Sequence, residues 1–342
     1  MVNQPLLISS QDACVSKQCE IEEWEEKMEK TCYHCHPLYY QSIAVDCLYF
    51  SQQESNIRFA AKTPDPQSED LTFYVINPKW KYDIGWRANL AFSFDSEWEC
   101  NFRWTYINNH ANSTPDFEPN FGVFTSLTSN GIYGYGNSFA QSIKGKWSLL
   151  MNVADLELVK PFYINSALLF RPLLGIKGCY IKRDLQVNYT DYQNNSFTAL
   201  NPNQVNCSSW VHGIGPEVGL DVRFLTRSKL DLFCRTVFSS MVGNFHTNTK
   251  YSKYTQFVVT PASFTKTTIK DDVKRLFCML QLQAAVSKRW DICGSTLEIL
   301  IGWETQFWIK QLRLDTLNTL DTHTEESDLT LYGPFARIAL TF

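Results

Sequence analysis

The chain has 342 residues, a formal net charge of −4, 14% aromatic residues and 19% charged residues. The weak negative charge gives no electrostatic basis for binding nucleic acid, and no run of about 18 apolar residues is present to form a membrane-spanning helix. A mean hydropathy of −0.24 remains compatible with a membrane β-barrel, because a polar lumen and polar loops dilute the apolar outer face.

Residues 1–38 are expected to form a separate, periplasmic segment that is helical and rich in cysteine. Ile21, Trp24 and Met28 would lie on one side of a helix and a row of glutamates on the other. One narrow apolar stripe indicates packing on a partner or on the barrel rim, with a solvated tail as the alternative. The first residues lack the basic and apolar regions of a signal peptide, so an exported protein requires that this signal was removed.

From residue 39 to residue 342 the hydrophobic period becomes two, which predicts β-strands. From Trp98 to Tyr106, for example, aromatic residues alternate with Glu99, Asn101 and Arg103. The runs exceed the usual strand of about 5–6 residues and match the roughly 9–11 that cross a membrane at a tilt. We predict an all-β fold, a transmembrane antiparallel up-and-down β-barrel of about ten strands, over residues 40–52, 80–95, 97–109, 146–161, 166–185, 208–226, 229–244, 272–288, 295–311 and 328–342.

The connections are expected to alternate between tight turns and long polar loops, which is the layout of an outer-membrane barrel with both ends on the periplasmic side. The long loops are expected at residues 52–78, 108–142, 188–206, 246–270 and 315–327. Residues 57–62 and 254–260 could add a hairpin, so twelve strands is the alternative count. Bulges are expected at Pro172, at Pro216 and near residues 153–156, and aromatic residues including Trp147 are expected to form girdles near the strand ends.

Six short blocks within residues 40–342 carry a family resemblance: Val45–Phe50, Gly85–Arg87, Asp155–Phe162, Phe170–Gly175, Gly213–Asp221 and Gly302–Glu304. In this order they resemble the pore-forming major outer membrane protein family of Legionella, which has relatives among Chlamydiae. The resemblance implies an exported, porin-like β-barrel. The many cysteines are more similar to those of a chlamydial envelope protein, in which disulfide cross-links substitute for a thick peptidoglycan wall.

Strand parity places one set of charged residues in the lumen, where they are predicted to line a pore. Acids and bases on facing strands would create a transverse field that orients permeating solutes. The alternative is that the charges pair and fill the barrel, since an unpaired buried charge is costly and ten strands lie close to the filled, eight-stranded case. The set is Arg87, Arg103, Asp155, Glu157, Arg171, Lys177, Glu217, Asp221, Arg223, Arg235, Glu298, Glu304, Lys310 and Arg337.

Eleven cysteines suggest an oxidising compartment, and their odd number leaves at least one without a disulfide partner in the chain. Residues 32–36 fit the C-x-x-C-H pattern of haem attachment, and the same thiols with a histidine could bind zinc. Nothing nearby resembles a haem fold, so disulfides are the preferred interpretation and no cofactor or metal is predicted. The disulfide candidates are Cys14, Cys19, Cys32, Cys35, Cys207 and Cys293, whereas Cys100, Cys234 and Cys278 fall on the lipid-facing parity.

The sequence therefore predicts a protein of the bacterial outer membrane that is not an enzyme and that lets small hydrophilic solutes diffuse passively. The alternative is a structural surface protein with a filled barrel, cross-linked through disulfides. The expected partners are outer-membrane lipid, disulfide-linked envelope proteins or further copies of the chain, and the barrel insertion machinery. For that machinery, Phe342 would be the recognition end.

Overall fold

A computed structural model describes most of the chain from residue 41 onward. The described residues are 41–55, 60–63, 74–76, 78–95, 98–113, 122–125, 139–194, 197–199, 203–226, 230–255, 263–292, 294–318 and 321–342. The predicted helical, cysteine-rich segment of residues 1–38 lies outside them. None of the described residues forms a helix long and apolar enough to span a membrane.

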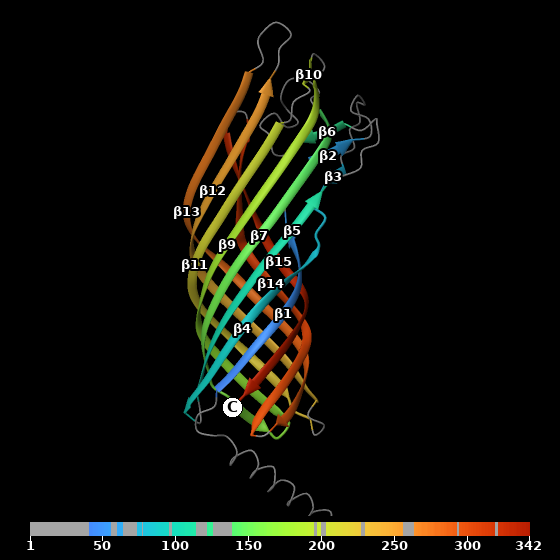
Figure 1. Cartoon of the computed structure of the whole chain (residues 1–342). Coiled ribbons are helices and arrows are strands. Elements are labelled where there is room, and N and C mark those ends of the chain that lie inside the picture. Colours follow the sequence, from blue (N-terminus) through green and yellow to red (C-terminus); the bar gives the residue numbers. More distant parts are fainter. Residues whose placement is uncertain are drawn as a thin grey trace, which may run out of the picture.

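Ten of the fifteen described strands form a closed antiparallel barrel (Figure 1). The barrel closes because β1 pairs with β15 on one side and with β4 on the other, so that Asp46 lies opposite both Arg337 and Arg87. The ten strands are β1 (Gln41–Glu54), β4 (Tyr82–Asp95), β5 (Trp98–Ser113), β7 (Phe139–Val159), β9 (Leu168–Asn194), β11 (Asn203–Phe224), β12 (Leu230–Thr255), β13 (Ser263–Ile292), β14 (Ser295–Asn318) and β15 (Asp321–Thr341).

Five short strands lie outside this ring, and they explain why twelve barrel strands was the wrong alternative. β2 (Ala60–Thr63) covers part of the predicted extra hairpin, but it pairs with β3 (Tyr74–Ile76) and β6 (Gly122–Thr125) and with no barrel strand. β8 (Phe162–Asn165) and β10 (Phe197–Ala199) are hairpin additions to β9.

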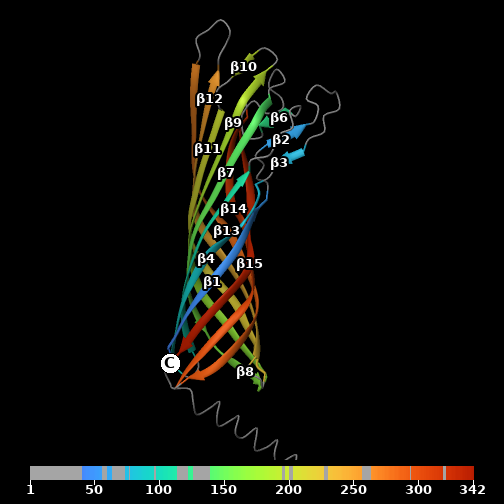
Figure 2. The ribbon, with the colours of Figure 1, turned by 45° about the vertical axis from the view of Figure 1, so that its right-hand side comes forward.

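The two ends of the barrel differ (Figure 2). The end that holds the short connections, such as β4–β5 and β13–β14, also holds the paired residues Gln41 and Phe342, and we call it the short-turn end. At the opposite, long-hairpin end, β9, β11, β12, β13, β14 and β15 continue well beyond the predicted strands. Three of the five segments predicted as long polar loops, 188–206, 246–270 and 315–327, are thus largely paired strand, because polar residues can alternate in a sheet that has water outside it. Much of the other two, 52–78 and 108–142, lies outside the described residues.

Side chains alternate between inside and outside along the long strands. In β1, Asp46 and Leu48 are fully buried, whereas Ile43 and Val45 are 52% and 56% exposed. The exposed residues of the other barrel strands are also mainly aliphatic and aromatic around the middle of the barrel, as a lipid-facing surface requires.

Aromatic rings gather on the outside where this apolar band ends. Tyr82 stacks on Tyr49 with ring centroids 5.1 Å apart, and Tyr332 contacts both Tyr82 and Trp303. Such a girdle marks the boundary of the membrane. Trp147 was expected in the girdle but is buried inside the barrel, because the alternation in β7 puts odd-numbered residues inside.

None of the three expected bulges is present in the described strands. The register of β9 with β11 is continuous through Pro172 and Pro216, and that of β7 with β5 is continuous from Val153 to Leu156. Each proline removes one ladder donor, and the register of its strand nevertheless does not shift. The register instead shifts between Trp308 and Leu312 in β14, where Lys310 has a positive φ of 55°.

Candidate functional site: the barrel interior

The lower half of the interior, toward the short-turn end, contains charged side chains that pair with one another. Arg87, 1% exposed, bridges two buried carboxylates: its Nη1 lies 3.2 Å from Asp46 and its Nη2 lies 2.7 Å from Glu304. Arg337 donates to Asp46 over 2.7 Å from the other side. The carboxylate of Glu304 also accepts a hydrogen bond of 2.6 Å from each of three amides, those of Gln281, Gln283 and Gln306.

A second network joins β5, β7, β11 and β12 across the lumen. Glu157 is fully buried, and its Oε1 pairs with Nη2 of Arg103 at 2.8 Å and with Nη2 of Arg235 at 2.5 Å. Arg235 also pairs with Asp221 at 3.0 Å. Two arginines on one carboxylate neutralise it and also tie three strands that are far apart in the sequence.

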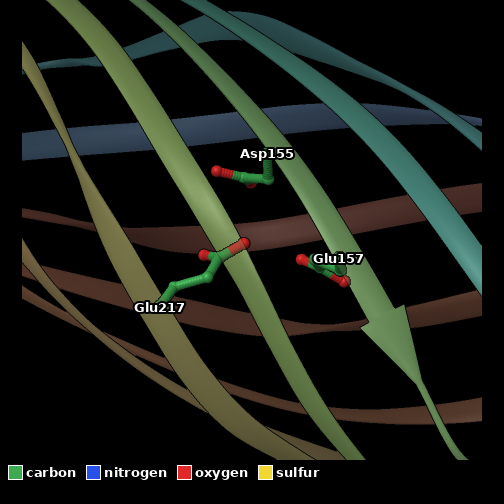
Figure 3. A group of neighbouring side chains, drawn as sticks. All are labelled: Asp155, Glu157 and Glu217. Atoms are coloured by element: carbon green, nitrogen blue, oxygen red, sulfur yellow. The ribbon is translucent and has the colours of Figure 1, made fainter.

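Three carboxylates of this region, Asp155, Glu157 and Glu217, lie within 4.8 Å of one another (Figure 3). Such a group could hold a metal ion. However, the Lys177 ammonium lies 2.5 Å from Asp155 and 3.1 Å from Glu217. A protein cation therefore already occupies the position that a metal would take between these two acids.

Closer to the short-turn end, further pairs cross between strands. Arg223 pairs with Glu298 at 2.7 Å and Arg289 with Asp231 at 2.7 Å. Arg171 donates to Glu99. These side chains extend the polar layer to the rim.

The upper half of the interior, toward the long-hairpin end, is mainly apolar, although it also buries the amides of Gln52, Asn109 and Gln311. It begins where β1 passes from Asp46 to Leu48 and Phe50, and where β14 passes from Glu304 to Trp308. Rings pack across it, with Phe277 against Trp308 at 6.5 Å between centroids. We call this the sealing layer, and its members include Leu48, Phe50, Ile107, Trp147, Met151, Phe277, Met279, Trp308 and Leu331.

One ion pair is embedded in the sealing layer. Arg183 of β9 lies 3.2 Å from Glu54 of β1, and the indole of Trp147 donates to the same carboxylate over 3.2 Å. All three side chains are at most 6% exposed, so this contact joins opposite walls without opening a path to water.

The structure places thirteen of the fourteen predicted lumen residues inside the barrel, each in an ion pair. Lys310 is the exception: it is exposed, because the bulge between Trp308 and Leu312 shifts the parity of β14 at this point. Sequence reasoning missed several inward charges that the same parity rule would have found. They are Asp46, Glu54, Glu99, Arg183, Asp231 and Arg289.

The cysteines are spread over both faces. Cys47 and Cys234 are exposed on the outer face with free thiols, and Cys100 and Cys278 are partly exposed there. The outward position of Cys100, Cys234 and Cys278 is the one predicted from the sequence. Cys207 does not head its strand, because β11 begins four residues earlier, and its thiol is buried and accepts a hydrogen bond from Thr249. Cys207 is therefore inaccessible to another protein.

The remaining disulfide candidates, Cys14, Cys19, Cys32, Cys35 and Cys293, lie outside the described residues. Phe342 lies at the seam, where its amide donates to the carbonyl of Gln41 over 2.9 Å, and its side chain is 53% exposed.

Comparison with known families identifies what kind of barrel this is. The sequence model of the family described as "Legionella pneumophila major outer membrane protein precursor" matches residues 35–342. The chain belongs to this family. This confirms the resemblance drawn from the sequence and places the protein in the bacterial outer membrane.

Solved structures show similarity at the level of the barrel. The outer membrane protease OmpT from Escherichia coli has a TM-score of 0.43 at 8% identity, covering 89% of this chain and 96% of its own. A Pseudomonas aeruginosa FadL homologue has a TM-score of 0.27 at 8% identity, covering 89% and 90%. The P. putida toluene transporter TodX has a TM-score of 0.26 at 7% identity, covering 90% of each chain. No curated protein sequence matches significantly, and likenesses this weak support no inference about activity.

Proposed function

We propose that this outer-membrane protein is a non-enzymatic, structural barrel whose lumen is filled by its own side chains and which holds long hairpins at the cell surface. The observation behind the proposal is the stacking of two filled layers inside ten strands: a charge-paired polar layer and, above it, the sealing layer. Strand number agrees, since eight strands are just filled by side chains and sixteen leave an aqueous channel.

The charges in the lumen are arranged for pairing and not for a field across a pore. Acids and bases alternate around the wall, so that Arg87 lies between Asp46 and Glu304, and Glu157 lies between Arg103 and Arg235. A permeating ion would have to displace these partners and then cross an apolar layer, where a charge without partners is costly.

Porin-like diffusion is the second candidate, and one observation favours it. Several buried polar atoms of the lower layer have no hydrogen-bond partner in the described part of the chain: Nε and Nη1 of Arg103, Nε of Arg235 and Oγ of Ser239. Buried polar groups of this kind are usually satisfied by water. A hydrated lower layer would be a vestibule, and the same argument extends into the sealing layer, where Nε2 of Gln52 and Oδ1 of Asn109 also have no partner among the described residues.

Solute uptake into proteoliposomes separates the two candidates. For the filled barrel, vesicles that contain refolded protein should swell in small sugars no faster than protein-free vesicles. Swelling that increases with the amount of protein and falls with solute size would overturn the proposal in favour of diffusion.

The proposed structural role includes a chlamydia-like cross-linking of the envelope through the tail cysteines. The support is compositional: four of the eleven cysteines precede residue 41. Non-reducing gels of whole envelopes should show high-molecular-weight bands that collapse with reductant. Replacing Cys14, Cys19, Cys32 and Cys35 by serine should remove these bands, and monomeric migration of the unreduced protein would exclude cross-linking.

A further inference from the structure

The outer face of β7, β9, β11, β12 and β13 changes abruptly in character at one level. The strand registers define rows of outward residues across these five strands. The last apolar row holds Ile214, Val242 and Leu276, which are 64%, 44% and 59% exposed. Consecutive rows are two residues apart along a strand, and five such steps separate this row from the row of Phe224 and Leu232 near the short-turn end. At about 6.7 Å per step and a tilt of about 45°, this band is roughly 24 Å tall, as a lipid-facing band should be.

Immediately above the last apolar row, aromatic rings pack against histidine rings. Tyr180 lies 4.7 Å from His212 between ring centroids, and Trp210 lies 5.2 Å from His246 with nearly parallel planes. Amphipathic rings of this kind sit at the level of the lipid headgroups. The next residues outward are therefore in reach of headgroup substituents.

A basic surface lies at the level of these rings and beyond it, and we call it the lysine face: Lys146, Lys182, Lys250, Lys270 and Lys274. Four of the five are exposed and have no carboxylate partner among the described residues, Lys182 being the exception.

The acids on the same face do not cancel this charge. Asp184 pairs with Lys182 at 3.0 Å and accepts a hydrogen bond from Ser208, and Asp272 is held by His246 at 2.6 Å. A net positive charge remains on the lysine face.

The lysine face is hollowed. A cavity of about 440 Å³ has Lys146 on one side and Lys250 on the other, and the outward residues Asp184, Gln186, Asn206 and Ser208 line it on the two strands between them. The two lysines are on strands three spacings apart, or about 14 Å, and hydroxyl and amide groups lie between them. Cations at the edges and amide and hydroxyl groups at the centre suit a polar, anionic sugar headgroup, because the carboxylate of Asp184 at the centre is paired with Lys182 at 3.0 Å.

We propose that the lysine face binds the phosphate-bearing headgroup of a glycolipid of the outer leaflet, with its acyl chains on the apolar rows below. Charge complementarity selects an anion, and continuity with the lipid-facing band selects an amphiphile over a free anion. This interaction is separate from the role proposed for the lumen, since it uses only outward residues.

The test is the amount of glycolipid retained by the protein in detergent. The probe is diphosphorylated lipid A, compared with dephosphorylated lipid A and with inorganic phosphate, and binding is followed by native mass spectrometry. The combined variant Lys146→Gln, Lys250→Gln, Lys270→Gln should lose about 100-fold in affinity, because each lysine near an anionic lipid surface contributes about five-fold. The matched control, Lys288→Gln, removes an exposed lysine near the opposite end, beside Trp290, and should retain full affinity.

Three results would overturn the proposal. The first is equal binding of dephosphorylated lipid A, which would leave only acyl contacts. The second is inorganic phosphate binding as tightly as the glycolipid, which would identify a free-anion site. The third is unchanged affinity of the triple variant, provided that its heat-modifiable gel mobility shows a folded barrel.

Discussion

At the scale of single residues, Arg87 illustrates how the interior is stabilised. It is 1% exposed and reaches Asp46, Glu304 and the hydroxyl of Thr105, so three strands besides its own depend on one guanidinium. A buried pair of this kind contributes little by itself, but breaking it leaves a charge without compensation.

Glu304→Ala should therefore destabilise the barrel by about 3–5 kcal/mol, because Asp46 is shared with Arg337 and cannot alone neutralise Arg87. Urea unfolding in lipid vesicles measures the loss. The double variant Arg87→Met, Glu304→Leu should recover most of it, since an apolar pair of similar volume leaves no unpaired charge. A Glu304→Ala variant as stable as the natural protein would show that the network does not hold the strands.

At the scale of elements, the seam between β1 and β15 decides whether the barrel closes. Gly333 allows a close approach there, since a Cβ at this position would lie 2.1 Å from the carbonyl oxygen of Tyr49. Gly178, by contrast, would meet its nearest atom at 3.9 Å.

Gly333→Ala should destabilise the seam by about 1–3 kcal/mol, as overpacking does, and should reduce the heat-modifiable fraction on gels. Gly178→Ala is the control and should leave this fraction unchanged. Equal behaviour of the two variants would mean that the seam tolerates the added carbon.

Deletion of Phe342 tests the assembly signal predicted from the sequence. The side chain is exposed beside the seam and makes no core contact among the described residues, so its loss should impair membrane assembly more than export. Pulse-chase labelling followed by cell fractionation should show protein that has been exported across the inner membrane but has not assembled in the outer membrane. Normal assembly of the truncated protein would assign the signal to another residue.

Sequence alone predicted the ten strands and their tight turns because the lipid-facing residues alternate so regularly. It did not predict that β12 extends to Thr255 or that β13 begins at Ser263. The reason is that strands with water outside carry no apolar outer face to mark them in the sequence. The alternation of side chains also predicted correctly that most of the charged residues point into the barrel. It failed at Lys310, because a bulge interrupts the alternation there.

The sealing layer escaped prediction for a different reason. Trp147 and Trp308 are buried inside strands whose outer residues are also partly apolar, so alternation gives no contrast between the two faces. An inward tryptophan and a girdle tryptophan look the same in sequence.

At the scale of the whole molecule, the polar layer, the sealing layer and the outer apolar band together describe a barrel built to remain in the membrane and stay closed. The most direct measurement of this claim is single-channel recording in planar bilayers. The natural protein should be silent, and so should the variant Trp147→Ala, Phe277→Ala, Trp308→Ala, because the charge-paired polar layer still fills the lumen below the hollowed sealing layer. Regular conductance steps from the natural protein would contradict the account.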